Sequence, residues 1–269
     1  FQVLPRGVPE IVHLCGRLPL ALTMAGRLAA SVGLVETSDW SGMITVLKDE
    51  LRESHSGGTE GGMIRASLRG LKGSPQEQES VRSVFKLFAM VPEDTHCPLE
   101  VLLLMFNAIL PAAQPKASIM HIRKWLRILI DRSLVLGTVD RPSVHDLVLD
   151  FAVAQHSADE LRKQHRLILQ SFRASRPQDA YARLNFDRAR ADSALTLYVC
   201  NEIGHHVSHA LEAAGREHDQ LATTIWLTDT PQDEIVVAVG RAFGTQSLSS
   251  LAQAAEAARD WWLAARYWA

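Results

Sequence analysis

Ser133-Leu-Val-Leu-Gly-Thr-Val-Asp-Arg-Pro-Ser-Val-His-Asp146 is the stretch that decides the fold. Its apolar residues lose the helical spacing seen before it, so it predicts two short strands, 133–139 and 142–144, joined by a turn at Asp140-Arg141-Pro142. Helical spacing resumes directly after it. A small β-hairpin is therefore expected inside a chain that is otherwise helical.

Three helices are predicted ahead of this hairpin. Their apolar residues recur at steps of three and four over 81–88, 99–109 and 119–130, which is the period of a helix with one buried face. Three helices followed by a β-hairpin predict a winged-helix domain, and we place it at residues 74–156.

The first 73 residues are predicted to form a separate helical domain. Helical spacing from Val8 to Ala30 is interrupted by Pro19, which lacks an N–H donor and clashes with the preceding helical turn. Two helices are therefore expected to meet at the Gly16–Pro19 step. A further helix is expected to begin near Ser38 or Asp39, since both are good N-cap residues.

The remaining segments are predicted from their composition. The glycine-rich cluster 54–62 is expected to form a loop before a short helix at 63–71. Residues 157–269 are predicted to form an all-α domain, broken by a connector at 174–192. Its Ala-rich end, 252–268, is either one unit of a helical repeat or a terminal amphipathic helix. Other helices in this domain are expected over 159–172, 203–214, 220–227 and 233–243.

Composition narrows the classes of function. The formal net charge is −2, so no global basic field is available to hold a nucleic acid. The three cysteines, Cys15, Cys97 and Cys200, lie far apart in the sequence, which argues against a disulfide framework or a cysteine zinc site and favours a cytoplasmic location. No apolar run approaches the roughly 20 residues needed to cross a bilayer, so no membrane association is expected.

Four segments between Gly16 and Val148 resemble motifs of one family, in the family's order. Gly16-Arg17-Leu18-Pro19-Leu20-Ala21 resembles the GLPLA motif of NB-ARC proteins, with Arg17 as an unusual residue inside it, and Val144-His145-Asp146-Leu147-Val148 resembles their MHD motif, with Val in place of Met. Residues 85–94 are similar to the LF-PED element, and residues 131–135 to the segment before the MHD motif. The chain thus resembles the regulatory half of a STAND-type (NB-ARC-like) signalling NTPase, of the kind found in NLR and apoptosome-like proteins.

The resemblance implies a fold and a ligand. The fold would be a helical ARC1-like segment, an ARC2-like winged helix and a C-terminal helical domain. The ligand would be ADP or ATP, with Pro19 against the adenine and His145 on the β-phosphate, and bound ADP would hold the protein closed until nucleotide exchange. The implied contact residues are Gly16, Leu18, Pro19, Leu20, His145 and Asp146.

Each of these residues also has a purely structural interpretation. Pro19 would then only kink a buried helix. Without the resemblance, this is the interpretation that we favour. His145 would cap a helix, with Asp146 complementing the helix dipole. The capping and phosphate-binding roles of His145 are compatible, because a capping side chain still faces a particular direction.

The chain is not expected to hydrolyse ATP by itself. It contains no GxxxxGK[ST] motif, and the glycine cluster 57–62 lacks the lysine that would meet the phosphates. Nor does it contain an apolar strand that ends in paired carboxylates to hold Mg²⁺. The resemblance implies that these groups belong to a domain N-terminal to Phe1, which would share the nucleotide, and that the full-length protein forms homo-oligomers when activated.

Two other functions remain open at this point. One is a winged-helix DNA-binding regulator whose recognition helix, 119–132, carries His121, Arg123, Lys124, Arg127 and Arg132. The other is a scaffold that keeps the fold but binds no nucleotide.

A metal site is not predicted from the sequence. His205 and His209 are four residues apart on one expected helix, which suits metal binding, and His206 lies between them. However, no third ligand is evident in the sequence, and His206 shares an apolar stripe with its neighbours. A set of helical histidines without a metal is therefore the expectation.

Overall fold

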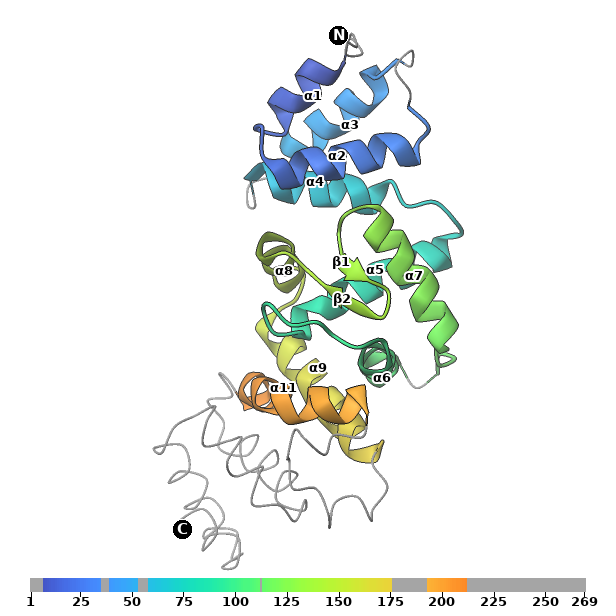
Figure 1. Cartoon of the computed structure of the whole chain (residues 1–269), viewed down its shortest axis with the longest axis vertical. Helices are drawn as coiled ribbons and strands as arrows, with labels where there is room; N and C mark the ends of the chain where they lie inside the picture. The colour runs from blue at the N-terminus through green and yellow to red at the C-terminus, as the bar shows by residue number, and fades with distance from the viewer. Residues whose placement is uncertain (1–6, 35–38, 53–57, 112, 176–192, 212–269) are drawn as a thin grey trace, which may run out of the picture. The chain divides into compact units, whose positions relative to one another are not determined.

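The computed structural model describes residues 7–34, 39–52, 58–111, 113–175 and 193–211 (Figure 1). Over these residues the chain is mainly helical with a small two-stranded antiparallel sheet, as predicted. The chain divides into two compact units. The first contains the described residues of 1–99 and 117–155, and the second those of 100–116 and 156–269. The division into three domains at residues 73 and 156 stays a prediction.

The first unit begins with four helices. They are α1 (Val8–Leu14), α2 (Pro19–Ser31), α3 (Ser41–Arg52) and α4 (Gly58–Arg69). Helix α1 contacts α2 and α3, and both α2 and α3 pack on α4 (Figure 1). The predicted break at Pro19 is confirmed, because this residue is the first of α2 and needs no N–H partner there. The core between these helices contains Met24, Leu28, Leu47, Met63 and Ile64.

The glycine cluster is helical at its C-terminal end, so the prediction of a loop as far as Gly62 is wrong. Helix α4 begins at Gly58 and includes Gly61 and Gly62, both buried. A Cβ on Gly62 would lie only 2.8 Å from Cδ2 of Leu51 on α3. The absence of a side chain thus lets α3 and α4 approach closely, and this packing outweighs the low helix propensity of glycine.

The rest of the first unit consists of helices and a hairpin. In chain order these are α5 (Pro75–Leu87), the 3₁₀ turn η1 (Phe88–Met90), α7 (Ile119–Asp131), β1 (Leu136–Thr138), β2 (Arg141–Ser143) and α8 (Asp146–Val153). Helix α5 packs against α7 and α8, and α8 contacts η1. The buried side chains here include Val84, Phe85, Phe88, Leu126 and Val148.

The β-hairpin is confirmed. Strand β1 is shorter than the predicted strand 133–139, and β2 begins one residue earlier than predicted, so Arg141 and Pro142 lie in the strand and not in the turn. Its antiparallel register pairs Leu136 with Ser143, Gly137 with Pro142 and Thr138 with Arg141. The backbone N–H of Cys97 also donates to the carbonyl of Pro142 at 3.0 Å, which joins β2 to the segment after η1.

The second unit contains α6 (Leu99–Ile109), α9 (Ala158–Ala174) and α11 (Ala194–Leu211). Leu99, the first residue of α6, is assigned to the first unit. Helices α9 and α11 pack together along their length. Ile168, Leu169, Phe172, Tyr198 and Val199 are buried on these two helices. Outside the described residues lie most of the predicted connector, at 176–192, the predicted helices 220–227 and 233–243, and the Ala-rich segment 252–268.

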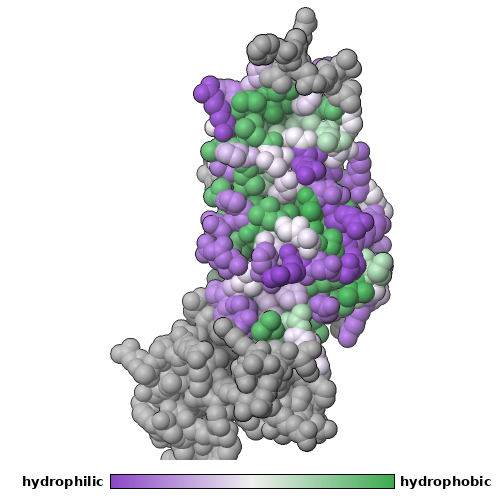
Figure 2. Space-filling view, viewed as in Figure 1, coloured by the Kyte–Doolittle hydropathy of each residue, from purple (hydrophilic) through white to green (hydrophobic). Residues whose placement is uncertain are grey.

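The surface of the described residues mixes polar and apolar side chains. On the face shown in Figure 2, apolar areas are separated by hydrophilic ones. Met120, 67% exposed on α7, is the most exposed large apolar side chain among the described residues. In the part of the chain that the structure describes, no helix combines the length and apolar character required to cross a membrane.

Candidate functional site

The turn between α1 and α2 carries four of the six predicted nucleotide contacts. Gly16 and Arg17 both adopt left-handed backbone conformations, with φ of 59° and 61°. Their N–H groups donate to the last carbonyls of α1, at His13 (3.0 Å) and Val12 (3.2 Å), which is how a helix C-terminus is commonly closed. Glycine at position 16 adopts this conformation without the strain that a side chain would add.

This turn is exposed. Gly16, Arg17, Leu18 and Pro19 all face solvent, and only Leu20 is half-buried. Leu18, 37% exposed, and the ring of Pro19 therefore present apolar surface outside the core. The interpretation of Pro19 as a kink inside a buried helix is wrong, because Pro19 begins an exposed helical end.

The side chain of Cys15 fixes the turn to the core of the first unit. It is fully buried, with Sγ 3.7 Å from the carbonyl oxygen of Ala21 and 4.0 Å from Sδ of Met63 on α4. Burial raises the pKa of the Cys15 thiol to about 11, because a low-dielectric surrounding disfavours the thiolate. Cys15 is a core residue, and the turn is tied to α4 through it.

His145 is the N-cap of α8. Its Nδ1 accepts a hydrogen bond from the N–H of Leu147 at 3.3 Å, and its carbonyl accepts from Val148 and Leu149. Because Nδ1 accepts, the neutral imidazole carries its proton on Nε2. The exposed His145 therefore offers an N–H donor at a helix N-terminus, with the carboxylate of exposed Asp146 next to it.

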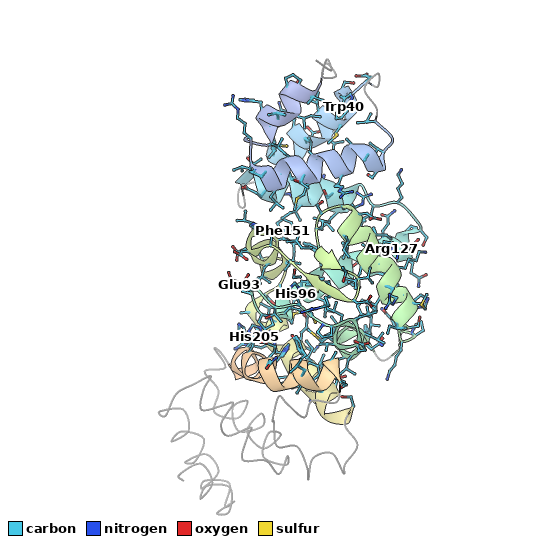
Figure 3. The ribbon with its side chains drawn as sticks, in the orientation of Figure 1. Trp40, Glu93, His96, Arg127, Phe151 and His205 are labelled. Atoms are coloured by element: carbon cyan, nitrogen blue, oxygen red, sulfur yellow. The ribbon has the colours of Figure 1, made fainter. Side chains whose placement is uncertain are left out.

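Helices α2 and α8, which carry the two predicted segments at their N-terminal ends, both contact α4, but the segments do not bond to each other. Thr59 Oγ1 at the start of α4 is 3.7 Å from the position of a Cβ on Gly16. Phe151 of α8, labelled in Figure 3, has its Cδ2 atom 3.7 Å from the position of a Cβ on Gly61 of α4. Among the described residues, no hydrogen bond joins the Gly16–Leu20 segment to His145 or Asp146. Helix α4 is the element through which the two segments connect.

A separate cavity of about 540 Å³ lies between α2, α3 and α4. None of the six predicted contact residues lines it. Its wall includes Glu50, which is buried on α3 and forms ion pairs with Arg69 at 2.8 Å and Arg65 at 3.4 Å. Glu50 follows the buried Met43 and Leu47 at helical spacing, so it lies on the apolar face of α3. A carboxylate at such a position was the signal in the sequence that Glu50 has charged partners.

A cluster of four histidines joins α9 to α11 in the second unit. His165 of α9 meets His205, His206 and His209 of α11, with ring centroids 5.5, 5.1 and 5.0 Å from its own. The rings of His205 and His209 are 4.2 Å apart. His165 and His206 are fully buried, whereas His205, labelled in Figure 3, and His209 are half-buried.

Hydrogen bonds orient these rings. Nδ1 of His165 lies 3.0 Å from Nδ1 of His206, whose Nε2 lies 3.3 Å from Oη of Tyr198. Nδ1 of His209 lies 2.9 Å from the carbonyl of His205, so it carries the proton and donates. Burial lowers the pKa of His165 and of His206, and the neighbouring imidazoles lower it further, so both rings are neutral.

The histidine cluster is the arrangement that the sequence did not reveal. His205 and His209 were recognised by their spacing, but the third imidazole comes from α9, 40 positions earlier in the chain. Nitrogen atoms of His165, His205 and His209 all lie within 4.8 Å of one another. These three residues are the ones in the described part of the chain that could hold a metal ion.

Similarity to known proteins adds no assignment to these sites. No protein-family model matches the chain, and no curated protein is significantly similar to it. The candidate functions therefore rest on the residues and their geometry.

Proposed function

We propose that the chain is the regulatory, nucleotide-sensing part of a STAND-type signalling switch, in which ADP is the ligand of the closed state. The helical α1–α4 segment would be the ARC1-like part, and α5, α7 and the hairpin would belong to the winged helix. The nucleotide would be shared with a phosphate-binding domain that precedes this chain, since the sequence contains no GxxxxGK[ST] motif.

The observation that carries the proposal is the orientation of His145. Its Nδ1 is engaged by the N–H of Leu147, so Nε2–H is the donor that remains for a ligand. This donor lies at the N-terminus of α8, where unpaired backbone N–H groups and the helix dipole favour an anion. A β-phosphate is such an anion, and its repulsion from the Asp146 carboxylate would be offset by His145 and the helix end binding it together.

The exposed turn at Pro19 supports the same ligand. A proline ring is a flat, rigid apolar surface, and the exposed Leu18 lies beside it. Such a surface suits the face of a purine. Because the turn and α8 both contact α4, a nucleotide bound at either segment is able to influence the other through that helix.

The proposed switch follows from differential binding. ADP shifts the protein toward the closed state only by the difference between its affinities for the closed and open states. Exchange to ATP would remove the His145 contact, release the winged helix from the nucleotide-binding domain and permit homo-oligomerisation.

The test is the affinity for ADP in the protein that includes the phosphate-binding domain. His145→Ala is expected to weaken ADP binding about tenfold, which corresponds to about 1.4 kcal/mol for one charge-assisted hydrogen bond, and to raise basal oligomerisation. His96→Ala is the matched control, because His96 is an exposed histidine in a loop of the same unit. Unchanged ADP affinity and oligomeric state in His145→Ala contradict the proposal.

The ion pairs of α7 disfavour the DNA-binding alternative. Arg123 pairs with Asp140, Lys124 pairs with Glu77 at 2.5 Å, and Arg132 is buried. Two of these cations are therefore paired with carboxylates, and the third lies in the interior of the first unit. A DNA binder would show affinity for random duplex that falls steeply with salt, and we expect no such binding.

A further inference from the structure

Three imidazoles of the second unit converge from two helices, in an arrangement that the nucleotide proposal does not use. His205 and His209 are separated by one helical turn of α11, so their side chains lie on one face of that helix. His165 approaches the same face from α9. From this convergence we propose that His165, His205 and His209 bind one divalent transition-metal ion of the zinc class, which clamps α9 to α11.

The geometry of the three ligand atoms suits one ion. In a tetrahedral site with Zn–N bonds of about 2.0–2.1 Å, ligand nitrogens are roughly 3.3 Å apart. The nitrogens here lie within 4.8 Å of one another, so small rotations of the side chains close them on a common ion. Three protein ligands leave the fourth tetrahedral position to water. His205 and His209 are half-buried, which gives this position access to solvent.

The surrounding hydrogen bonds are those that a histidine-bound metal requires. A ligating histidine usually donates its other ring N–H to a carbonyl or another acceptor, which fixes its tautomer and orientation. Nδ1 of His209 donates to the carbonyl of His205. Its lone pair is therefore on Nε2, the atom that would bind the ion.

His206 and Tyr198 play this orienting role for His165. With the proton on Nδ1 of His165, that atom donates to Nδ1 of His206, and Nε2–H of His206 donates to Oη of Tyr198. The lone pair of His165 is then on Nε2. This Nε2 is buried and has no hydrogen-bond partner among the described residues, whereas buried polar atoms are normally satisfied. Coordination to a metal ion supplies the missing partner.

The donor set also selects the class of metal. Imidazole nitrogens suit zinc, copper, nickel and iron, whereas Mg²⁺ and Ca²⁺ prefer oxygen ligands. The metal-binding group in the described residues consists of histidines alone. A d¹⁰ ion such as Zn²⁺ accepts tetrahedral coordination without electronic preference.

The experiment uses the full chain without an affinity tag, stripped of metal by a chelator. Zn²⁺ is titrated by calorimetry in the presence of a competing chelator, and Co²⁺ is added as a spectroscopic probe whose visible absorption reports tetrahedral coordination. We expect one ion per chain and a tetrahedral Co²⁺ spectrum. Absence of stoichiometric binding to the unchanged chain overturns the proposal.

The decisive comparison is between two double variants. His205→Ala with His209→Ala is expected to weaken Zn²⁺ binding at least about 100-fold, since loss of ligands exceeds the 10–100-fold effect typical of an outer-shell partner. His13→Ala with His96→Ala removes two exposed histidines of the first unit and should leave the affinity unchanged. Equal affinities in the two variants overturn the proposal.

Circular dichroism checks that each variant is helical. A third variant, Tyr198→Phe, removes the hydroxyl that orients His206 and, through it, His165, without removing a metal ligand. This variant keeps the packing of the ring and is expected to weaken Zn²⁺ binding up to about tenfold, toward the lower end of that outer-shell range, with one ion still bound. If the double variant at His205 and His209 does not fold, Zn²⁺ must raise the melting temperature of the unchanged chain and shift that of Tyr198→Phe less. Equal shifts in both overturn the proposal.

Discussion

The guanidinium of Arg132, at the end of α7, donates a hydrogen bond of 2.9 Å to the backbone carbonyl of Ser67 in α4. A second bond of 2.6 Å runs from the same side chain to the carbonyl of Gly70. Arg132 therefore closes the C-terminal end of α4, where carbonyls lack helical partners and the helix dipole favours a cation. This contact connects the α1–α4 helices to α7 within the first unit.

Replacing Arg132 is expected to destabilise the first unit. Arg132→Met leaves two carbonyls at the end of α4 without their donor, and we expect a loss of about 3 kcal/mol in the free energy of unfolding. Urea unfolding followed by circular dichroism measures this loss. Arg127→Ala is the matched control on the same helix, and because Arg127 is exposed its effect should stay within about 0.5 kcal/mol. Similar losses in both variants would show that the carbonyl contacts do not matter.

Neutralising Glu50 is expected to weaken the packing of α3 on α4. Glu50→Gln keeps the size of the side chain but removes the charge that pairs with Arg65 and Arg69. Because Glu50 is buried and both arginines are partly exposed, we expect a loss of about 2 kcal/mol. Glu10→Gln breaks an exposed pair with Lys48 and should cost less than half as much. Urea unfolding compares the two variants, and equal costs contradict this account of Glu50.

The Cys15 thiol is expected to make stability depend on alkaline pH. Its pKa is about 11 in the folded chain, against 9.0 for an ordinary thiol. Above pH 9 the unfolded chain loses the thiol proton while the folded chain keeps it, so stability is fully present below pH 9 and is lost between pH 9 and 11. Cys15→Ala should remove this part of the slope when the melting temperature is followed across that range. A slope that is unchanged in the variant argues against the shifted pKa.

Two glycines of the same region are expected to respond to alanine in opposite directions. Gly26 is exposed within α2, and nothing lies within 4 Å of a Cβ added there, so Gly26→Ala should stabilise the unit by about 1 kcal/mol. Gly16 has φ of 59°, and Gly16→Ala should destabilise it by about 1 kcal/mol through backbone strain. Thermal unfolding of both variants tests this, and a stabilising effect at Gly16 would contradict the left-handed turn.

Local patterns in the sequence were sufficient for most of the described secondary structure. The helices over 99–109 and 119–130, the break at Pro19 and the hairpin after Ser133 all agree with the structure. These features depend on residues a few positions apart: on helical hydrogen bonds, on the N–H that proline lacks, and on the side chains that alternate between the two faces of a strand. The six nucleotide contacts, which rest on resemblance, stay predictions.

Tertiary packing decided the rest. Gly62 is helical because α3 approaches α4 closely at that residue, and Arg132 is a buried cap instead of an exposed cation because α4 ends beside it. The spacing of His205 and His209 was visible in the sequence, but His165 joins them only because α9 packs on α11. Periodicity specifies which face of a helix is buried, and only the packing of distant helices specifies which side chains meet there.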